Sequence, residues 1–441
     1  MEGYFVRTLG MHRVYNSAFM NMLKNEENAK YRASIKNVLE FDPEILKRFV
    51  NFMNNPDEET AVAQFGKDDK YFGVCTLMVT MPGLPMFGHG QIEGFAEKYG
   101  MEYRRAYWDE QPDPYLIQRH EREIFPLMKR RYLFADVQNF LLYDFFTPEG
   151  TVNENVFAYS NRAGEERALV VYNNKYEQAR GWIRTSVAFA VKTGQGDGHM
   201  LVQKTLGEGL GLHAAPNYFC IFRDHVTGLE YIRNSKQLCD QGLYVELGAF
   251  KYHVFLDFRE VQDDAWQHYA QLTAYLDGRG VPSIEGALHD LLVQPIQQPF
   301  RELVNAAMFR RLIAARLTEA GGLLDQALLD EVEGKLVHLL REAKQFSGAT
   351  GDEVALAQAL RRELEAILQL PALGRGAGGE GITSDRSYRI AARYLWMVAQ
   401  GADPCVWGTL LGWWSVHALG KLATEAQFAP QSRSWIDEWR L

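Results

Sequence analysis

Two short stretches of the sequence place polar side chains directly after apolar runs, where a backbone can present them to a ligand. The first, FMNNPDEE at residues 52–59, follows the apolar run RFVNFMN and contains Asn55, Pro56 and Asp57 in succession. Because proline fixes its own φ and biases the preceding residue toward extended backbone, Pro56 would hold the Asp57 carboxylate in one orientation. Such a carboxylate could stabilise positive charge that develops in a reaction. The structural alternative is that Asp57 caps a helix beginning at Glu58.

The second stretch, PGLPMFGHGQIEG at residues 82–94, is an apolar run bracketed by prolines and glycines, which strand interiors disfavour. It predicts the end of a buried strand that opens at once into a loop. His89 lies between two glycines of this loop and could contact hydroxyl groups of a ligand or simply pack against its neighbours. Glu93 could face the same site, or it could remain a solvated loop carboxylate.

The hydrophobic periodicity of the chain changes twice and predicts three segments. Over residues 1–145, short apolar runs alternate with helical stretches, which is the βα alternation of a parallel sheet. Residues 150–262 consist of period-two runs separated by Asn, Gly and Asp turns, and this pattern indicates an antiparallel β-sandwich. Over residues 265–441, Leu and Ala at three- and four-residue spacing predict an all-α region with a glycine-rich linker near 373–385.

Together, the two polar stretches resemble the end of the catalytic barrel of the α-amylase superfamily, glycoside hydrolase family 13. That family carries F-x-x-N-H-D after barrel strand seven and PG-x-P-x-x-x-x-G-[DQ]-E-x-G at strand eight. The matching residues are Phe52, Asn55 and Asp57 in the first motif, and Pro82, Gly83, Pro85, Gly90, Gln91 and Gly94 in the second. Pro56 stands where most members have His, as in the maltosyltransferase branch, and Glu93 lies one position later than the family's usual Glu.

This resemblance implies part of a (β/α)8 TIM barrel, about strands six to eight, with its chemistry on loops at the C-terminal ends of the strands. The antiparallel segment that follows would correspond to the family's domain C. The resemblance further implies that Asp57 stabilises the transition state of a retaining reaction on α-linked glucans and that Asn55 orients it. His89 and Glu93 would then contact the substrate, an α-glucan or a maltooligosaccharide.

The segment EKYGMEYRRAYWDEQPDPY at residues 97–115 combines aromatic rings with charged side chains. Tyr103 and Trp108 are its candidates for substrate binding, because aromatic faces suit the apolar faces of pyranose rings. The alternative is an aromatic loop that is pinned against the top of the barrel.

Two carboxylates that the family needs are absent from these 441 residues. The family's nucleophile is an Asp in G-x-R-x-D after strand four and its general acid is a Glu after strand five, and neither G-x-R-x-D nor D-x-x-x-N-H occurs in the sequence. We therefore expect the C-terminal fragment of a glycoside hydrolase or glucanotransferase, inactive alone, whose partner is the missing N-terminal half of the barrel. The alternative is a natural non-catalytic protein that binds glucan or pairs with another chain.

Composition argues against several other classes of partner. The formal net charge is −9 and the chain has no run of Lys and Arg of the kind that follows phosphates, so we expect no nucleic acid. No apolar run reaches the ~18 residues that span a bilayer, so we expect no membrane association. The four cysteines lie far apart without C-x-x-C spacing, which favours free thiols in a cytoplasmic setting and no metal site. We expect no cofactor.

Overall fold

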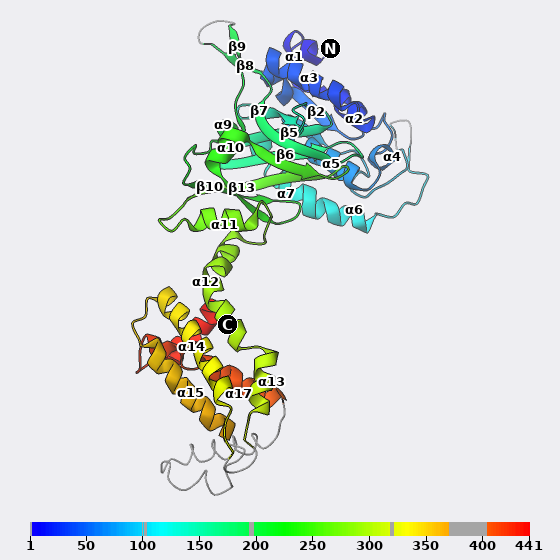
Figure 1. The fold of residues 1–441 in the computed structure, drawn as a ribbon. Helices are drawn as coiled ribbons and strands as arrows, with labels where there is room; N and C mark the ends of the chain where they lie inside the picture. The colour runs from blue at the N-terminus through cyan, green and yellow to red at the C-terminus, as the bar shows by residue number, and fades with distance from the viewer. Residues whose placement is uncertain (1, 99, 101–103, 194–197, 318–321, 370–403) are drawn as a thin grey trace. The chain divides into compact units, whose positions relative to one another are not determined.

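The computed structural model describes residues 2–98, 100, 104–193, 198–317, 322–369 and 404–441 (Figure 1). The chain divides into two compact units, Met1–Leu288 and His289–Leu441. The segments predicted over 1–145 and 150–262 both lie within the first unit, and their division into separate domains stays a prediction. The glycine-rich linker predicted near 373–385 lies outside the described residues.

A small parallel sheet opens the first unit. Its strands β1 (Val14–Tyr15), β2 (Phe49–Phe52) and β3 (Leu84–Met86) are hydrogen-bonded in that order. The helices before and between these strands are α1 (Glu2–Arg7), α2 (Ser17–Lys24), α3 (Asn28–Phe41), the 3-10 helix η1 (Pro43–Arg48), α4 (Ala61–Phe65) and α5 (Asp69–Thr80). The predicted alternation of strand and helix is confirmed here.

The two edge strands of this parallel sheet carry exposed apolar side chains. Tyr15 pairs with Val50, and Val50 with Leu84, so the three side chains share one face of the sheet. Tyr15 is 55% exposed and Leu84 is 45% exposed, whereas Val50 on the central strand is buried. Parallel strands are normally covered on both faces, and a barrel closes both edges of its sheet. Within the described part of the chain, neither β1 nor β3 has a second strand neighbour.

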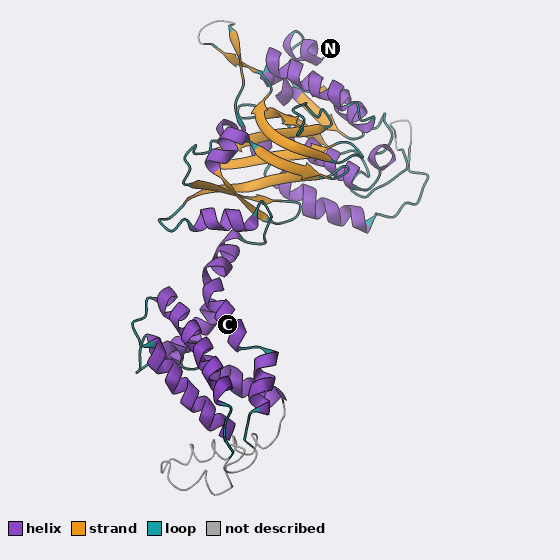
Figure 2. Ribbon diagram, viewed as in Figure 1, coloured by secondary structure: helices purple, strands orange, loops and turns teal. Residues whose placement is uncertain are grey.

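Eight further strands form one continuous antiparallel sheet in the order β11-β10-β13-β6-β5-β4-β7-β12. They are β4 (Leu141–Phe146), β5 (Val156–Ala163), β6 (Glu166–Asn173), β7 (Ala179–Ser186), β10 (Tyr218–Asp224), β11 (Glu230–Asn234), β12 (Leu243–Leu247) and β13 (Tyr252–Gln262). Figure 2 shows the strands of the first unit in orange. The predicted antiparallel strands are confirmed, whereas the two separate sheets of a sandwich are not. A period-two run indicates that alternate side chains of a strand lie on opposite faces. It does not indicate what packs against either face.

Both faces of the antiparallel sheet carry buried side chains. On one face, Leu142 and Tyr159 belong to the hydrophobic core that also contains Phe19 of α2 and Ile35 of α3. The opposite face has a core of its own, to which α9 (Leu206–Leu210) and α10 (Ser235–Gln241) contribute. The βα region and the antiparallel sheet therefore share one core and fold as parts of the same unit.

A buried arginine fastens α3 to this sheet. Arg32 is fully buried, and its Nη1 donates to the carbonyl oxygens of Tyr143 at 3.2 Å and Val156 at 3.1 Å. Its Nη2 donates to Asp144 at 2.6 Å and its Nε to Glu154 at 2.5 Å. Buried cations need this complete pairing, because an unpaired charge in the interior is costly.

Several short elements complete the first unit. They are α6 (Pro114–Arg119), a π-helical turn (His120–Ile124), α7 (Phe125–Lys129), α8 (Arg131–Phe134), the hairpin strands β8 (Phe189–Lys192) and β9 (His199–Val202), and α11 (His268–Leu276). α12 (Ile284–Leu303) begins in the first unit and continues into the second.

Every secondary-structure element described in the second unit is a helix. They are α13 (Ala306–Ala314), α14 (Gln326–Ser347), α15 (Glu353–Gln369), α17 (Pro404–Val416), the 3-10 helix η4 (Leu419–Leu422) and α18 (Phe428–Trp439). Their buried leucines and tryptophans form one core, in which the indole Nε1 of Trp414 donates to the carbonyl of Leu360 at 2.9 Å.

Candidate functional site

The loop after β2 is held by an asparagine turn. The Oδ1 atom of Asn55 accepts hydrogen bonds from the backbone N–H of Asp57 at 2.9 Å and of Glu58 at 3.1 Å. Short polar side chains commonly close such turns on their own backbone. The next helix, α4, begins at Ala61 and has Thr60 as its N-cap. The alternative that Asp57 caps a helix beginning at Glu58 is therefore wrong.

Asp57 lies on the exposed side of this turn. Its backbone carbonyl accepts a hydrogen bond from Lys98 Nζ at 2.9 Å, and its side chain is solvent-exposed. Because β2 ends at Phe52, the turn lies just beyond the C-terminal end of the strand. An exposed carboxylate at this end of a parallel strand is open to a ligand that approaches from solvent.

The loop after β3 needs its glycines for conformation and for space. Gly90 has φ +69°, and a Cβ atom there would lie 2.7 Å from the Cβ of Phe95. A Cβ atom on Gly88 would lie 2.3 Å from the Oδ1 of Asn54. The side-chain Oε1 of Gln91 accepts from the Gly88 N–H at 3.1 Å and closes this loop on itself. Glycine is thus required where the two loops touch.

These two loops and the segment near residue 97 enclose a small pocket. Its volume is about 30 Å³, which is room for one or two water-sized groups. It is lined by Asn54, Asn55, Pro56, Glu58, Thr60, His89, Glu97 and Lys98. The structure therefore brings the predicted Asn55 and His89 together, while the Asp57 side chain stands beside this lining on the exposed turn.

Asn54 is a pocket residue that motif matching missed, because its neighbour Asn55 filled the motif position. The Asn54 side chain is buried, and its Oδ1 has no hydrogen-bond partner among the described residues. A buried acceptor without a partner costs about 1–3 kcal/mol. A hydroxyl donor of a ligand in the pocket would satisfy it. The only sequence signal was a second asparagine directly after a buried apolar run.

Hydrogen bonds to two carboxylates join the segment that contains Trp108 to the segment near residue 97. Glu97 accepts from the backbone N–H of Tyr107 at 2.7 Å and of Trp108 at 3.0 Å. Glu110 accepts in return from the N–H of Ala96 at 2.7 Å and of Glu97 at 2.8 Å. The Trp108 side chain is 60% exposed, so the indole is available to a ligand. The alternative of a ring packed on the barrel top does not describe Trp108.

Glu93 and Tyr103 are not placed in the pocket. Glu93 is absent from the pocket lining, and its carboxylate acts on the buried Tyr71 and His120 instead. Burial raises the pKa of Tyr71 and lowers that of His120, and the negative charge of Glu93 raises both pKa values. Tyr103 lies outside the described residues.

Replacing Gly88 by Ala tests the contact between the two loops. The new methyl group would overlap the Asn54 side chain, and we expect a loss of about 1–3 kcal/mol in the free energy of unfolding. Urea unfolding of both proteins measures it. Gly286→Ala is the control, because its methyl group would meet only Ser283 at an ordinary 3.6 Å. Equal stability of Gly88→Ala and wild type would contradict the described packing.

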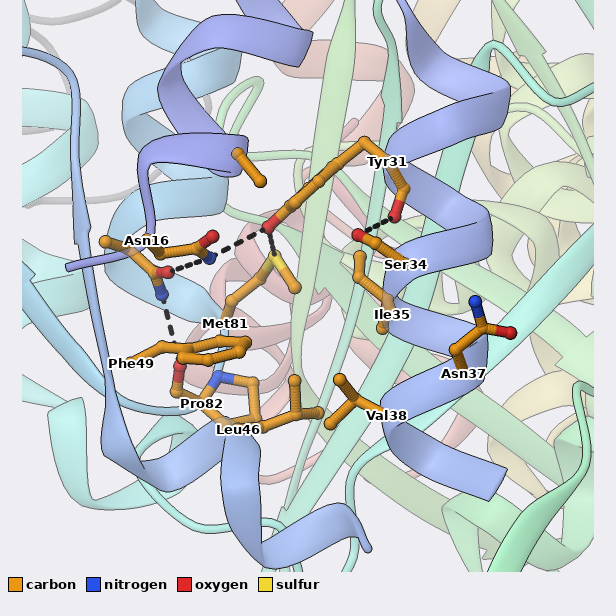
Figure 3. A pocket seen from close by; sticks show the side chains of 12 residues that line it. Asn16, Tyr31, Ser34, Ile35, Asn37, Val38, Leu46, Phe49, Met81 and Pro82 are labelled. Atoms are coloured by element: carbon orange, nitrogen blue, oxygen red, sulfur yellow. Dashed lines mark hydrogen bonds between the residues drawn. The ribbon is translucent and has the colours of Figure 1, made fainter. Parts of the chain in front are cut away.

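A larger hollow of about 220 Å³ lies beside α3 and the strands β1 and β2 (Figure 3). Asn16 Nδ2 donates to Asn51 Oδ1 at 2.9 Å, and Asn51 Nδ2 donates to the Pro82 carbonyl at 3.1 Å. Tyr31 is its single titratable lining residue, and burial raises the pKa of this tyrosine far above its usual value. The lining offers no carboxylate or imidazole for catalysis. The asparagine chain ties neighbouring strands together, which is a structural role.

No group of three or more His, Cys, Asp or Glu side chains among the described residues could hold a metal ion. None of the helices described is both long enough and apolar enough to cross a bilayer.

No family model matches the sequence, and no curated protein matches it. The structure is similar to that of an α-amylase from Geobacillus thermoleovorans complexed with acarbose, at 14% identity over 51% of this chain and 42% of that one, with a TM-score of 0.34. A maltogenic α-amylase from Thermotoga neapolitana gives 12% identity over 57% and 52%, with a TM-score of 0.35. A γ-CGTase from an alkalophilic Bacillus clarkii gives 16% identity over 59% and 34%, with a TM-score of 0.34.

These structures belong to the same class of enzyme that residues 52–59 and 82–94 resemble. The chain spans between 34% and 52% of the length of the three. All three TM-scores are below 0.5, and we base no assignment of function on them.

Proposed function

We propose that this chain is part of an α-amylase-type enzyme that hydrolyses or transfers α-linked glucans with retention of configuration. Its three parallel strands would be strands six to eight of a (β/α)8 barrel. About five further strands, from sequence outside this chain or from a partner, would complete the barrel. The antiparallel sheet would correspond to the domain that follows the barrel in this family.

The observation that carries this proposal is the meeting of two loops at one end of the parallel sheet. Asn55 follows β2, His89 follows β3, and both line one pocket. In barrel enzymes the reacting groups lie on the loops at the C-terminal ends of the strands. The exposed apolar side chains of Tyr15 and Leu84, on the two edge strands, support the same proposal, because the neighbouring strands of a complete barrel would cover them.

The residues would have separate roles in catalysis and in substrate binding. Asp57 would stabilise the oxocarbenium-like transition state with its exposed carboxylate. Asn54 and Asn55 would bind hydroxyl groups of the sugar, and Trp108 would lie against the apolar face of another sugar ring. The nucleophile and the general acid would come from the strands that this chain lacks.

The experiment is an assay of the chain alone and of the chain joined to the sequence encoded upstream. We expect the chain alone to release no sugar from starch, glycogen or maltooligosaccharides, and the joined protein to do so. Turnover by the chain alone would contradict the requirement for outside carboxylates. An upstream reading frame without G-x-R-x-D would favour the second candidate, a glucan-binding or partner-pairing protein, for which the exposed apolar side chains on the edge strands β1 and β3 are the supporting observation.

A further inference from the structure

The eight-stranded sheet ends in a pocket that lies between its two edge strands. β11 and β12 stand at opposite ends of the strand order, yet both contribute to the lining of one hollow of about 340 Å³. The sheet therefore curls until its edges approach one another. Pockets of this size are typical of small-molecule sites.

The floor of this edge pocket is aromatic. Phe222, Tyr231 and Phe255 line it, and Phe255 packs edge-on against the other two rings at centroid distances of 5.1 and 5.9 Å. These rings come from the three neighbouring strands β10, β11 and β13. A rigid aromatic floor favours an apolar or ring-shaped ligand body.

Two guanidinium groups lining the edge pocket lack a carboxylate partner. Arg233 and Arg279 each donate two hydrogen bonds to backbone carbonyls, at 2.8 to 3.0 Å. Neither forms an ion pair within 4.0 Å among the residues that the structure describes. Arg233 is half-buried, and burial lowers its pKa. Guanidinium groups with unused N–H donors at a concave site suit carboxylate or phosphate.

A histidine of the same pocket is held by a buried acid. His253 lines the pocket, and its Nδ1 lies 3.0 Å from the carboxylate of the fully buried Asp224. An Nδ1–H bond to a carboxylate fixes the ring orientation and leaves Nε2 for another partner. Two carboxylates also line the pocket, Asp277 and Glu246, and both are exposed. Glu246 is engaged by the Tyr244 hydroxyl at 2.7 Å.

We propose that the edge pocket binds a small organic anion, whose carboxylate or phosphate pairs with Arg233 and Arg279 beside His253 and whose ring or apolar body lies on the aromatic floor. This site is separate from the loops after β2 and β3. A test of the edge pocket does not test the proposed glucan activity, because no residue is shared between the two sites.

The test is calorimetric titration of the full chain with phenyl phosphate, which carries both an anion and a ring. Inorganic phosphate and phenol, which each carry one feature, are compared with it. We expect saturable binding of phenyl phosphate, at least about tenfold tighter than either comparison ligand. Arg233→Gln and Arg279→Gln are each expected to weaken it about tenfold or more, because each removes charge-assisted hydrogen bonds.

The matched control is Arg184→Gln. Arg184 lies over the ring of Trp182 on β7 and does not line the edge pocket, so its replacement should leave affinity within about twofold. Arg279 is exposed, so Arg279→Gln remains informative if Arg233→Gln fails to fold. Absence of saturable binding up to roughly 10 mM would overturn the proposal, as would wild-type affinity in both pocket variants or phenol binding as tightly as phenyl phosphate.

Discussion

Asp57→Asn is expected to lower kcat/KM for maltooligosaccharides by about 10³-fold, or about 4 kcal/mol, in the protein whose barrel is complete. The substitution keeps the size of the side chain and removes the negative charge that would stabilise the oxocarbenium-like transition state. Because the Asp57 side chain is exposed and the hydrogen bonds of this residue are made by its backbone, we expect the melting temperature to stay unchanged. Steady-state kinetics with maltooligosaccharides measure the effect.

Glu59→Gln is the matched control for this prediction. Glu59 is another exposed carboxylate on the same loop, and it does not line the pocket. Its replacement should change kcat/KM by less than about twofold, since surface charges at a distance from the reacting atoms are screened. Activity of Asp57→Asn within tenfold of wild type would show that this carboxylate is not part of the catalytic machinery.

Arg32→Met is expected to lower the free energy of unfolding of the first unit by about 3–5 kcal/mol, because it removes one member of a buried charged network. Two backbone carbonyls would lose the guanidinium donor, and two carboxylates would keep only Lys36 as a cationic partner. The long apolar side chain of methionine retains most of the packing volume. The loss of unfolding free energy would therefore come mainly from removal of the charged group. Hydrogen exchange of peptides from β4 and β5 along a urea series isolates the first unit from the helical one.

Lys36→Met is the control for the arginine. The Lys36 Nζ contacts the same two carboxylates, at 3.0 Å for Asp144 and 3.7 Å for Glu154, but its side chain is 26% exposed. Because this ion pair is partly exposed and the Arg32 network stays in place, we expect a loss below about 1 kcal/mol. If the two substitutions were equally mild, α3 would be held to the sheet by its apolar contacts alone.

Local patterns in the sequence predicted the types of element and their order. The alternation of apolar runs and helical stretches predicted the parallel strands that end at Phe52 and Met86. The period-two runs predicted the antiparallel strands, since strand periodicity records two faces whatever packs against them. The Asn-Pro-Asp and Gly-His-Gly stretches predicted loops with polar side chains directly after strands, because proline and glycine constrain the backbone locally.

Within the candidate site, the sequence could not distinguish Asn54 from Asn55. Both follow the same apolar run, and only the approach of Gly88 to the Asn54 side chain shows that Asn54 is the buried one. The sequence also left open whether Asp57 caps a helix. In the structure the residue that caps α4 is Thr60, three residues later. Site assignments of this kind depend on contacts between loops that are about thirty residues apart.

The sequence by itself determined which segments are strands, helices and glycine-bearing loops in the first unit, because these follow from torsion preferences and from the period of apolar residues. Only the tertiary structure decided that the eight antiparallel strands join as one sheet and that its two edge strands line one pocket together with His253. It alone also decided that the two edge strands of the parallel sheet keep exposed apolar side chains. The physical reason is that strand order and sheet curl are set by hydrogen bonds and packing between distant residues, which leave no periodic signal in the chain.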